Sequence, residues 1–381
     1  MRVLFVISGL AFGGAERQVI LLARELARRG HAACIYTLTH EAGRVHELSE
    51  SDVELVMDQK RRKLDPAVIR RLRRHIRAWR PDIVHGFLFD GNLYSRLAAW
   101  GTGIPVLNSE RNDNYDRDIK RLHRASYRLT SMLCDGVVAN SHAGAQFARR
   151  LHRLREAAHV VWNGIDLSEV DARLARGATP AREIFPGAGL KRLCMVAALR
   201  PQKDHGLALR VLKRLIERDP AWRLICVGDE QGSLFPGYKA RIMAERDRLQ
   251  LEPFVKFVGN RRDVLEIVAS SDLSLLTSLY EGFPNAVLEA MACGTAVVST
   301  DYSDVRRILP VPESIVGSRS EDDLAAAVLE CHGRRAEIAR TQRRWVESHA
   351  TMPAVASELL RVYARYLAGA AVPLAGAKGL R

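Results

Sequence analysis

The sequence predicts an α/β protein with two doubly wound parallel-sheet domains, and three observations support this fold class. Short apolar runs alternate with amphipathic helical segments along the chain. The alternation pauses at residues 163–166 (Asn-Gly-Ile-Asp) and resumes after a polar segment that ends near Gly189. The length of 381 residues is enough for two domains of ordinary size. We expect a first domain over 1–163 and a second over 164–352, facing each other across a cleft, with 353–381 as a last helix crossing back and a loose tail.

The first domain contains apolar runs of strand length that alternate with helical segments. The expected strands are Val3–Ile7, Ala33–Leu38, Ile83–His85, Pro105–Asn108, Gly136–Ala139 and His159–Trp162. The expected helices are Ala15–Arg29, Pro66–Trp79, Leu93–Trp100 and Ala143–Leu151. Strands separated by helices pair in parallel, because each helix carries the chain back to the same end of the sheet.

The second domain repeats the pattern. The expected strands are Arg192–Ala197, Arg223–Val227, Val255–Val258, Leu273–Leu276 and a strand that starts at Ala296. The expected helices are His205–Arg218, Pro236–Leu249, Val264–Ala269, a helix that Gly294 ends, and the last helix Pro353–Leu367. In open sheets of this kind, ligands bind outside the carboxyl ends of the strands.

Residues 278–300 are the most informative segment, because they place two carboxylates around a loop at the carboxyl end of a buried strand. Glu281 precedes the loop, and Glu289 lies just over one turn into the following helix. Gly282 lets backbone approach a ligand closely, and Pro284 suits the entry to a helix. Glu289 could accept hydrogen bonds from a vicinal diol such as ribose, while Glu281 points toward whatever is attached to the phosphate.

The start of this helix has the chemistry of an anion site. We expect the amides of Phe283, Asn285 and Ala286 to be free there. Free amides and the positive end of the helix dipole together favour phosphate. An alternative stays open: both acids, Glu281 and Glu289, could serve only to stabilise a helix N-terminus.

Two other loops have related features. Arg200 and Lys203 follow a strand end and could neutralise a diphosphate leaving group, or they could be surface charges of a βα loop. Gly13-Gly14 opens a helix directly after the first strand and could place amides against an anion, although paired glycines also occur in ordinary turns. The G-x-G-x-x-G dinucleotide fingerprint is absent from this turn.

The net charge of +14 lies mostly in the first half of the chain. Residues 60–63 and the outer face of the helix over 66–79 are basic. Further basic clusters are Arg117, Lys120, Arg121, Arg124 and Arg128, and then Arg149, Arg150, Arg153 and Arg155. An anionic membrane surface and a plain solvated surface are the competing explanations, and nucleic acid ranks last because no nucleic-acid fold signature is present.

Compartment and metal use follow from the cysteines and the apolar runs. The six cysteines are scattered without close pairs, which suits a reduced cytosol and does not suit a structural zinc site. No apolar run reaches the length of a membrane span, and the first residues resemble a strand rather than a secretion signal.

With these residues in view, the chain resembles the retaining GT-B glycosyltransferases, specifically glycosyltransferase family 4, over nearly its whole length. The matching segments are Gly13-Gly14-Ala15-Glu16, Asn163-Gly164-Ile165-Asp166, Pro201-Gln202-Lys203-Asp204-His205, Val227-Gly228-Asp229 and the E-x7-E pair, Glu281 and Glu289. The resemblance implies two Rossmann-like domains across a cleft, with a nucleotide-sugar donor in the second domain and the acceptor mainly on the first.

The resemblance also implies roles for individual residues. Glu289 would bind the ribose, Glu281 the hydroxyls of the donor sugar, and Lys203 the diphosphate. The turn 259–261 (Gly259, Asn260, Arg261) would face the base, and Gly13-Gly14 would approach the phosphates as the domains close. The full set of expected donor-binding residues is Gly13, Gly14, Lys203, Gly259, Asn260, Arg261, Glu281, Gly282, Phe283, Pro284, Asn285, Ala286 and Glu289, of which Glu281 and Lys203, with Arg200, form the expected catalytic set.

Two positions depart from the family pattern. The family usually carries an arginine five residues before the lysine, where this chain has Ala198, and Arg200 is the candidate to supply that charge. A histidine usually found after the fourth strand of the first domain is replaced by Arg111. We assign Arg111, Asn112 and His85 to the acceptor side.

The leading hypothesis is a retaining, metal-independent glycosyltransferase that uses a UDP- or GDP-linked sugar and needs no further cofactor. Its acceptor would be a glycan or a lipid-linked sugar in bacterial surface polysaccharide, lipopolysaccharide or exopolysaccharide assembly. The protein would be cytoplasmic and peripheral on the inner face of the plasma membrane. A sugar-nucleotide epimerase of the same fold and a non-catalytic sugar-nucleotide-binding subunit remain as alternatives.

Overall fold

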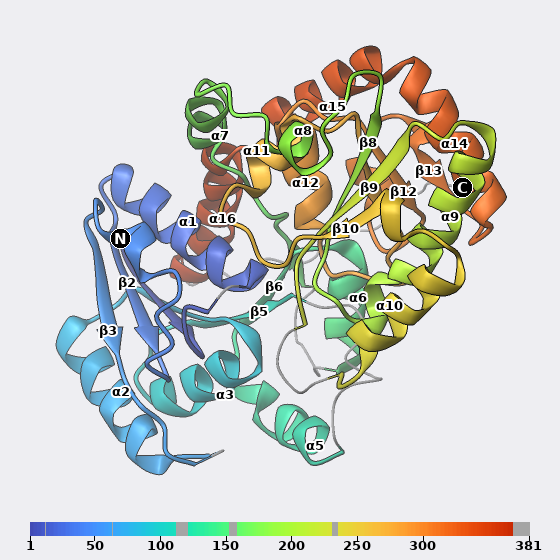
Figure 1. Cartoon of the computed structure of the whole chain (residues 1–381). Helices are drawn as coiled ribbons and strands as arrows, with labels where there is room; N and C mark the ends of the chain where they lie inside the picture. Colours follow the sequence, from blue (N-terminus) through green and yellow to red (C-terminus); the bar gives the residue numbers. More distant parts are fainter. Residues whose placement is uncertain (12, 63, 112–120, 152–157, 231–234, 369–381) are drawn as a thin grey trace, which may run out of the picture. The chain divides into compact units, whose positions relative to one another are not determined.

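The computed structural model describes the chain except for residues 12, 63, 112–120, 152–157, 231–234 and 369–381 (Figure 1). The chain forms two compact units, Met1–Gly164 together with Met352–Arg381, and Ile165–Thr351. The last helix therefore belongs to the first unit. Several expected features lie outside the described residues, namely Asn112, the basic residues Arg117, Lys120, Arg153 and Arg155, the side chains of Arg121 and Arg124, and the tail from residue 369.

The first unit is a seven-stranded parallel sheet with strand order β3-β2-β1-β4-β5-β6-β7. Its strands are β1 (Arg2–Ile7), β2 (Ala32–Thr37), β3 (Val53–Met57), β4 (Ile83–Gly86), β5 (Val106–Glu110), β6 (Gly136–Ala139) and β7 (His159–Val160). Its helices are α1 (Gly14–Arg28), α2 (Pro66–Trp79), α3 (Leu88–Ala99), α5 (Arg121–Thr130), α6 (His142–Leu151) and α16 (Met352–Leu367).

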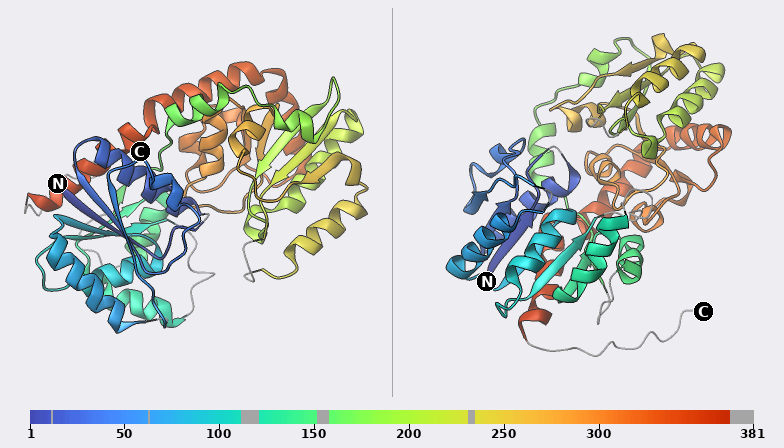
Figure 2. Two further views of the ribbon diagram at one scale, coloured as in Figure 1. Left: turned by 60° about the vertical axis from the view of Figure 1, so that its left-hand side comes forward. Right: turned by 90° about the horizontal axis from the view of Figure 1, so that it is seen from below.

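Each face of the first sheet has its own apolar core. Phe5 of β1, Ile20 of α1 and Leu359 of α16 belong to the core on one face. Val6 of β1 and Leu72 of α2 belong to the core on the other face. Helices α1 and α16 lie side by side, and α2 with α3 covers the opposite face, as two views of the ribbon show (Figure 2). Neighbouring residues of β1 thus face opposite cores, as the alternation of a buried parallel strand requires.

The sequence did not predict strand β3. It pairs in parallel with β2 at the edge of the sheet, where Glu54 lies opposite Cys34. Glu54 is exposed, and the other residues of β3 are only half-buried. The strand is an apolar run of only five residues, VELVM, with polar residues on both sides, so local pattern alone does not separate it from a connection. Because β3 was not counted, the strand expected over Pro105–Asn108, fourth in the sequence analysis, is the fifth strand of the structure, β5.

The second unit is a six-stranded parallel sheet with strand order β10-β9-β8-β11-β12-β13. Its strands are β8 (Lys191–Val196), β9 (Trp222–Val227), β10 (Val255–Phe257), β11 (Leu273–Leu276), β12 (Val297–Thr300) and β13 (Ile315–Val316). Its helices are α7 (Leu167–Leu174), α8 (Pro180–Ile184), α9 (His205–Arg218), α10 (Tyr238–Arg248), α11 (Val264–Ala269), α12 (Asn285–Ala292), α13 (Val305–Ile308), α14 (Glu321–Gly333) and α15 (Arg335–His349).

Helices α9, α10 and α14 share one large core with the second sheet. Leu209, Ile242 and Val328 of these helices belong to the same buried cluster as Leu193 and Leu224 of β8 and β9. Helices α7 and α8 lie in the segment that was expected to be a polar connection. The sequence did not predict them, because each is too short to show an amphipathic period. None of the helices within the described ranges has both the length and the hydropathy that a bilayer span requires.

Candidate functional site

The candidate site lies in the second unit, where β8 and β11 end beside each other at the carboxyl edge of the sheet. The chain leaves β8 through a single 3₁₀ turn, Pro201–Lys203, and enters α9. It leaves β11 through residues 277–284 and enters α12. Neighbouring parallel strands deliver both loops to the same edge, which is the ligand-binding edge of such sheets.

An ion pair joins the two loops. Lys203 Nζ contacts Glu281 Oε1, and Ser278 donates from Oγ to the same carboxylate oxygen at 2.7 Å. Gln202 Nε2 lies 3.5 Å from the other oxygen, Oε2, and donates to the carbonyl of Tyr280 at 2.6 Å. The side chains of Lys203 and Glu281 keep exposed fractions of 18% and 10%. The pair is therefore mostly shielded from water but can still be reached by a ligand.

Interactions of three residues, Asp204, Arg319 and Thr277, fix the turn that carries Lys203. Asp204 has a left-handed backbone, φ 46°, and its side chain caps α9 by accepting from Leu207 N at 3.1 Å. Arg319, from the loop before α14, forms an ion pair with Asp204 and donates to the carbonyl of Thr277 at 3.0 Å. Thr277 Oγ1 donates toward the carbonyls of Lys203 and Asp204, each at 2.9 Å. These bonds fix the lysine and the glutamate loop to each other before any ligand binds.

The start of α12 differs in part from the expectation. The amide of Asn285 donates to the carbonyl of Phe283 at 3.0 Å, so it is not free, and that prediction was wrong. The tight turn at Pro284 produces this bond, because it folds the chain back by two residues. The amides of Phe283 and Ala286 have no recorded partner among the described residues. Glu289 lies half-buried on α12.

The loops after β9 and β10 come close to the end of β8. Gly228 has φ 130°, and a Cβ there would lie 2.2 Å from the carbonyl oxygen of Ala197. Its amide donates at 2.8 Å to the carbonyl of Gly259, which also has a left-handed backbone, φ 68°. The close contact therefore requires glycine at position 228, and the positive φ favours glycine at position 259. The side chain of Arg261, expected to face a base, forms an ion pair with Asp263 at 2.7 Å.

One position that departs from the family pattern, Ala198, and the candidate to replace its charge, Arg200, stand just before the lysine turn. Ala198 is half-buried and lies two residues after the end of β8. Arg200 is also half-buried and directly precedes the 3₁₀ turn, with an extended backbone at φ −145°. Arg200 lies two residues farther along the same connection than Ala198, so its guanidinium starts from a different point of the loop.

Two titratable side chains beneath the site stay neutral. Burial, together with the nearby charge of Lys203, lowers the pKa of His205 to about 4. Burial, and to a lesser degree the carboxylate of Glu281, raises the pKa of Tyr302 well above its usual range. The charges available to a ligand at neutral pH are therefore those of the exposed loops, not of the groups below them.

In the first unit, Gly13 and Gly14 stand at the start of α1, as the sequence suggested. Gly13 is the N-cap residue, and a Cβ at this position would lie 2.1 Å from Glu16 Oε2. Burial raises the pKa of Glu16. The carboxylate of this helix's own first turn thus already lies against Gly13. An incoming phosphate would have to displace it or share the amides with it.

A polar network in the first unit joins the half-buried Arg111 to the fully buried His85. Arg111 donates to Asn163 Oδ1 at 2.7 Å and to Ser109 Oγ at 3.3 Å. His85 is fully buried, and its two ring nitrogens lie 2.9 Å from Ser109 Oγ and 2.7 Å from the hydroxyl of Tyr363. Burial lowers the pKa of His85 far below its usual range and that of Arg111 to about 10.

This network changes the interpretation of His85. Both of its nitrogens are already bonded inside the protein, so it has no free nitrogen to offer an acceptor. It instead supports Ser109, and through Ser109 the guanidinium of Arg111, which also lies 4.6 Å above the ring of Phe87. We therefore reassign His85 from the acceptor side to a supporting position.

Sequence reasoning missed several residues that shape both sites. In the second unit these are Gln202, Asp204, Ser278 and Arg319, and in the first unit they are Ser109, Asn163 and Tyr363. Ser278 had a local signal, because it stands three residues before Glu281 in the same loop. Arg319 and Tyr363 had none, because each reaches its partner from an element far away in sequence.

Comparison with families of known proteins gives two matches that follow the two units. A family described as Glycosyltransferase Family 4 matches residues 12–169. A family described as Glycosyl transferases group 1 matches residues 190–333, which include the Lys203 turn, Glu281 and Glu289. Together they match most of both units and leave residues 1–11, 170–189 and 334–381 outside.

Individual relatives agree with these families, and a solved structure shares the fold. A Bacillus subtilis glycosyltransferase named EpsF is 26% identical over 79% of each chain. An Escherichia coli enzyme named UDP-Gal:alpha-D-GlcNAc-diphosphoundecaprenol alpha-1,3-galactosyltransferase is 31% identical over 58% of each chain. The crystal structure of Anabaena Alr3699/HepE in complex with UDP-glucose has a TM-score of 0.81 at 20% identity, over 97% of this chain and 100% of that one.

Proposed function

We propose, from the premise that this chain belongs to the family 4 and group 1 glycosyltransferases of the GT-B fold, that it transfers a sugar with retention of the anomeric configuration. The donor would be a nucleotide sugar, and the acceptor a glycan or a lipid-linked sugar. The observation that carries the proposal is the Lys203–Glu281 ion pair beside the start of α12. In this pair, a cation that could bind a diphosphate, Lys203, is in direct contact with a carboxylate that could bind sugar hydroxyls, Glu281.

We propose a displacement in which the acceptor attacks the face of the sugar that the diphosphate leaves. The bond between the anomeric carbon and the donor phosphate breaks, and a bond to the acceptor oxygen forms on the same face of the sugar. The acceptor proton moves to the departing phosphate oxygen. Lys203 stabilises the negative charge that develops on the diphosphate, and Glu281 orients the sugar by accepting from its hydroxyls. Glu289, one turn into α12, would hold the ribose, and the free amides of Phe283 and Ala286 would contact phosphate.

We further propose a UDP-linked donor and a lipid-linked acceptor. The Anabaena structures contain UDP or UDP-glucose, and the name of the Escherichia coli relative specifies a UDP-linked donor and a diphosphoundecaprenol acceptor. We propose that no metal takes part, because Lys203 and the helix start can together balance the diphosphate. Surface-polysaccharide assembly in the cytoplasm, at the inner face of the plasma membrane, is the setting that such an acceptor implies.

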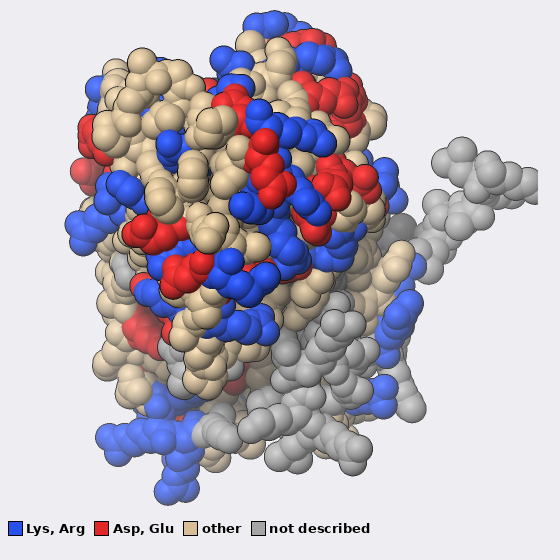
Figure 3. All heavy atoms as spheres, turned by 45° about the vertical axis from the view of Figure 1, so that its right-hand side comes forward, with Lys and Arg blue, Asp and Glu red and all other residues tan. Residues whose placement is uncertain are grey.

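The charge on α2 supports a membrane-facing role. Arg70, Arg74 and Arg77 are exposed, and no ion pair is recorded for them with any residue that the structure describes. Two basic side chains of α9 in the second unit are different, since Arg210 pairs with Glu245 at 2.7 Å and Arg214 with Asp322 at 3.0 Å. Figure 3 shows a face on which Lys and Arg lie among Asp and Glu in this way. Unbalanced arginines are attracted to anionic lipid, whereas paired ones are not.

A panel of nucleotide sugars tests the donor. Ligand binding to the folded state raises the unfolding temperature, so thermal shift with UDP-, GDP- and ADP-linked sugars ranks the candidates. We expect the largest shift with a UDP-sugar and a loss of most of that shift in Lys203→Ala. Wild-type stabilisation without transfer to any lipid-diphosphate acceptor would favour the non-catalytic alternative that Ala198 suggests. A new nucleotide-sugar epimer formed without acceptor would favour the epimerase.

Vesicle flotation tests the membrane role separately. We expect binding to phosphatidylglycerol-containing vesicles at low salt, little binding to phosphatidylcholine alone, and loss of binding in Arg70→Gln/Arg74→Gln/Arg77→Gln. The matched control removes three exposed arginines of the second unit, Arg218, Arg241 and Arg248. Equal loss in both triple variants would mean that net charge, and not α2, governs the association.

A further inference from the structure

The outer face of the first sheet brings a cysteine, a glutamate and a histidine together. Cys34 of β2 and Glu54 of β3 are directly opposite each other in the parallel register, so their side chains lie on the same face of the sheet. Helix α2 covers that face and contributes His75. The three residues come from three elements and are separated by 20 positions or more, so no sequence motif joins them.

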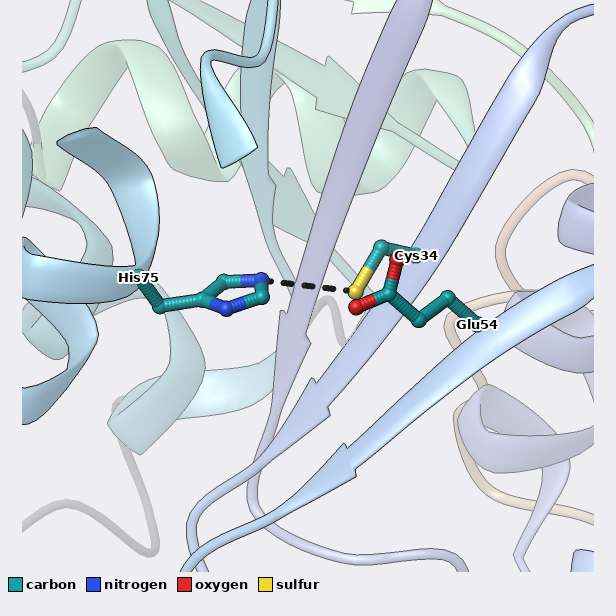
Figure 4. Close-up of side chains that lie close together, drawn as sticks. All are labelled: Cys34, Glu54 and His75. Atoms are coloured by element: carbon teal, nitrogen blue, oxygen red, sulfur yellow. Dashed lines mark hydrogen bonds between the residues drawn. The ribbon is translucent and has the colours of Figure 1, made fainter. Parts of the chain in front are cut away.

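The ligand atoms of these side chains converge. Cys34 Sγ and His75 Nε2 are 3.6 Å apart, and the candidate atoms of all three residues lie within 4.8 Å of one another. Figure 4 shows the imidazole and the carboxylate both directed at the sulfur. Tetrahedral zinc, with Zn–S near ~2.3 Å and Zn–N near ~2.0 Å, holds sulfur and nitrogen about 3.5 Å apart. The observed sulfur–nitrogen separation already matches that requirement.

We propose that Cys34, Glu54 and His75 form a zinc site, with the fourth position of the tetrahedron open to water on the solvent side. The donor set consists of one thiolate, one imidazole and one carboxylate, which are the three side-chain types that bind Zn²⁺ in proteins. Mg²⁺ prefers oxygen ligands and does not suit a sulfur and nitrogen pair. Among the residues that the structure describes, this is the one cluster of three such groups.

The surroundings orient two of the three ligands. Trp79 Nε1 donates to Glu54 Oε2 at 2.7 Å, which fixes the carboxylate while leaving its other oxygen for a metal. The ring of His75 lies between those of Tyr36 and Trp79, at centroid distances of 5.6 and 6.2 Å. Hydrogen bonds and packing of this kind set the direction of first ligands in metal sites.

Access and protonation suit reversible binding. Cys34 is fully buried, but Glu54 is exposed and His75 half-buried, so a cation can enter at the edge strand. Burial lowers the pKa of His75, which keeps its imidazole neutral and able to bind metal at neutral pH. Burial also raises the pKa of the Cys34 thiol, so the cation must displace a proton from sulfur as it binds.

Zinc binding to the full-length, untagged, metal-free protein tests this site. Isothermal titration should show one Zn²⁺ per chain, and Co²⁺ should produce the absorption bands of a thiolate-bound ion. Cys34→Ala and His75→Gln should each weaken Zn²⁺ binding at least about tenfold. Cys226→Ala is the matched control, because Cys226 is an equally buried strand cysteine in the second unit, outside this cluster. Binding that is unaffected in Cys34→Ala, or absent in the wild type, would overturn the proposal.

Glu54→Gln keeps the test decisive if the buried cysteine is needed for folding. Glu54 is exposed on the edge strand, so the amide preserves its shape and the fold. We expect this variant to keep the wild-type unfolding temperature without metal and to lose most of the rise that Zn²⁺ gives the wild type. Mg²⁺ should give no such rise at this site. An equal Zn²⁺-dependent rise in Glu54→Gln and in the wild type would contradict the assignment of its carboxylate.

Discussion

The two units differ in the polar side chains that they carry at the carboxyl edge of the sheet. In the second unit, the carboxyl edge carries an ion pair, Lys203 with Glu281, that remains partly exposed. In the first unit, the corresponding edge carries Arg111 in a network with Ser109 and His85, where the histidine is fully buried. One edge holds an ion pair between two loops, and the other holds a half-buried guanidinium that is hydrogen-bonded to side chains of its own unit.

This difference indicates a division of work between the units. A partly exposed ion pair can exchange partners at small cost, so Lys203 can turn to a diphosphate and Glu281 to hydroxyl groups. The fully buried His85 exchanges partners less easily, because a buried nitrogen left without a partner pays its full desolvation cost. The second unit is therefore suited to bind and release a charged donor, and the first to present a rigid surface.

The largest expected effect comes from breaking the exposed pair. Glu281→Gln should lower kcat about a thousandfold, or about 4 kcal/mol of transition-state stabilisation, because an amide cannot supply the carboxylate's charge. Donor binding should weaken far less, since Lys203 is then free for the diphosphate. Steady-state transfer kinetics and donor titration separate the two quantities. Glu313→Gln, which removes the acid of an exposed pair with Arg334, is the control and should leave kcat unchanged. A variant Glu281→Gln with near-normal turnover would contradict the role of the pair.

The next prediction concerns the loss of folding stability at acid pH that the buried histidines of the two units cause. The pKa of His205 is about 4 in the folded protein, against 6.5 for an ordinary histidine. The unfolded chain therefore takes up a proton as pH falls below 6.5, while folded His205 does not, and stability falls until about pH 4. This loss amounts to about 3 kcal/mol. His85 adds a loss of the same sign in the first unit.

Denaturant unfolding at pH 7 and at pH 4.5 measures this loss. His205→Gln should make the second unit less sensitive to acid than the wild type, whatever its stability at pH 7. His46→Gln is the control, because His46 is an exposed histidine of the first unit. If the acid-induced loss were the same in His205→Gln and in the wild type, the neutral state of His205 would not be its cause.

A smaller effect tests the rigidity of the first unit. Tyr363→Phe removes the hydroxyl that lies 2.7 Å from His85 Nδ1 and leaves a buried nitrogen without a partner. The expected cost is about 2 kcal/mol of unfolding free energy, measured by denaturant titration. Tyr366→Phe is the comparison, since its hydroxyl meets the half-buried His159 at 2.9 Å and should cost less. Equal costs would mean that burial of the network adds nothing.

The sequence was sufficient for the parts of both edges that depend on local pattern. The strands β8 and β11 and the helices α9 and α12 follow from apolar periodicity, and their order alone delivers Lys203 and Glu281 to one edge. In a parallel sheet the carboxyl ends of all strands lie at one edge, so the placement of both loops at that edge can be predicted without knowing the exact strand boundaries.

What the sequence could not supply depends on contacts between distant segments. Arg319 approaches Asp204, and Tyr363 approaches His85, from elements more than a hundred positions away. Burial of His85 follows from α16 packing on the first sheet, which no local pattern around residue 85 records. The edge strand β3 was missed for the same reason, since only its pairing with β2 reveals it.

The smallest effect concerns the hydrogen bond that aims Glu281. Ser278 Oγ donates at 2.7 Å to the same oxygen that contacts Lys203, so it holds the carboxylate without carrying charge itself. Ser278→Ala should lower kcat about fivefold, or about 1 kcal/mol, the usual net worth of one such bond. KM for the donor should change less, because the lysine and the helix start still bind the phosphates. Ser278→Thr, which keeps the hydroxyl, should recover much of the loss. A failure of threonine to do so, with the unfolding temperature unchanged, would show that the space at position 278 matters and its hydrogen bond does not.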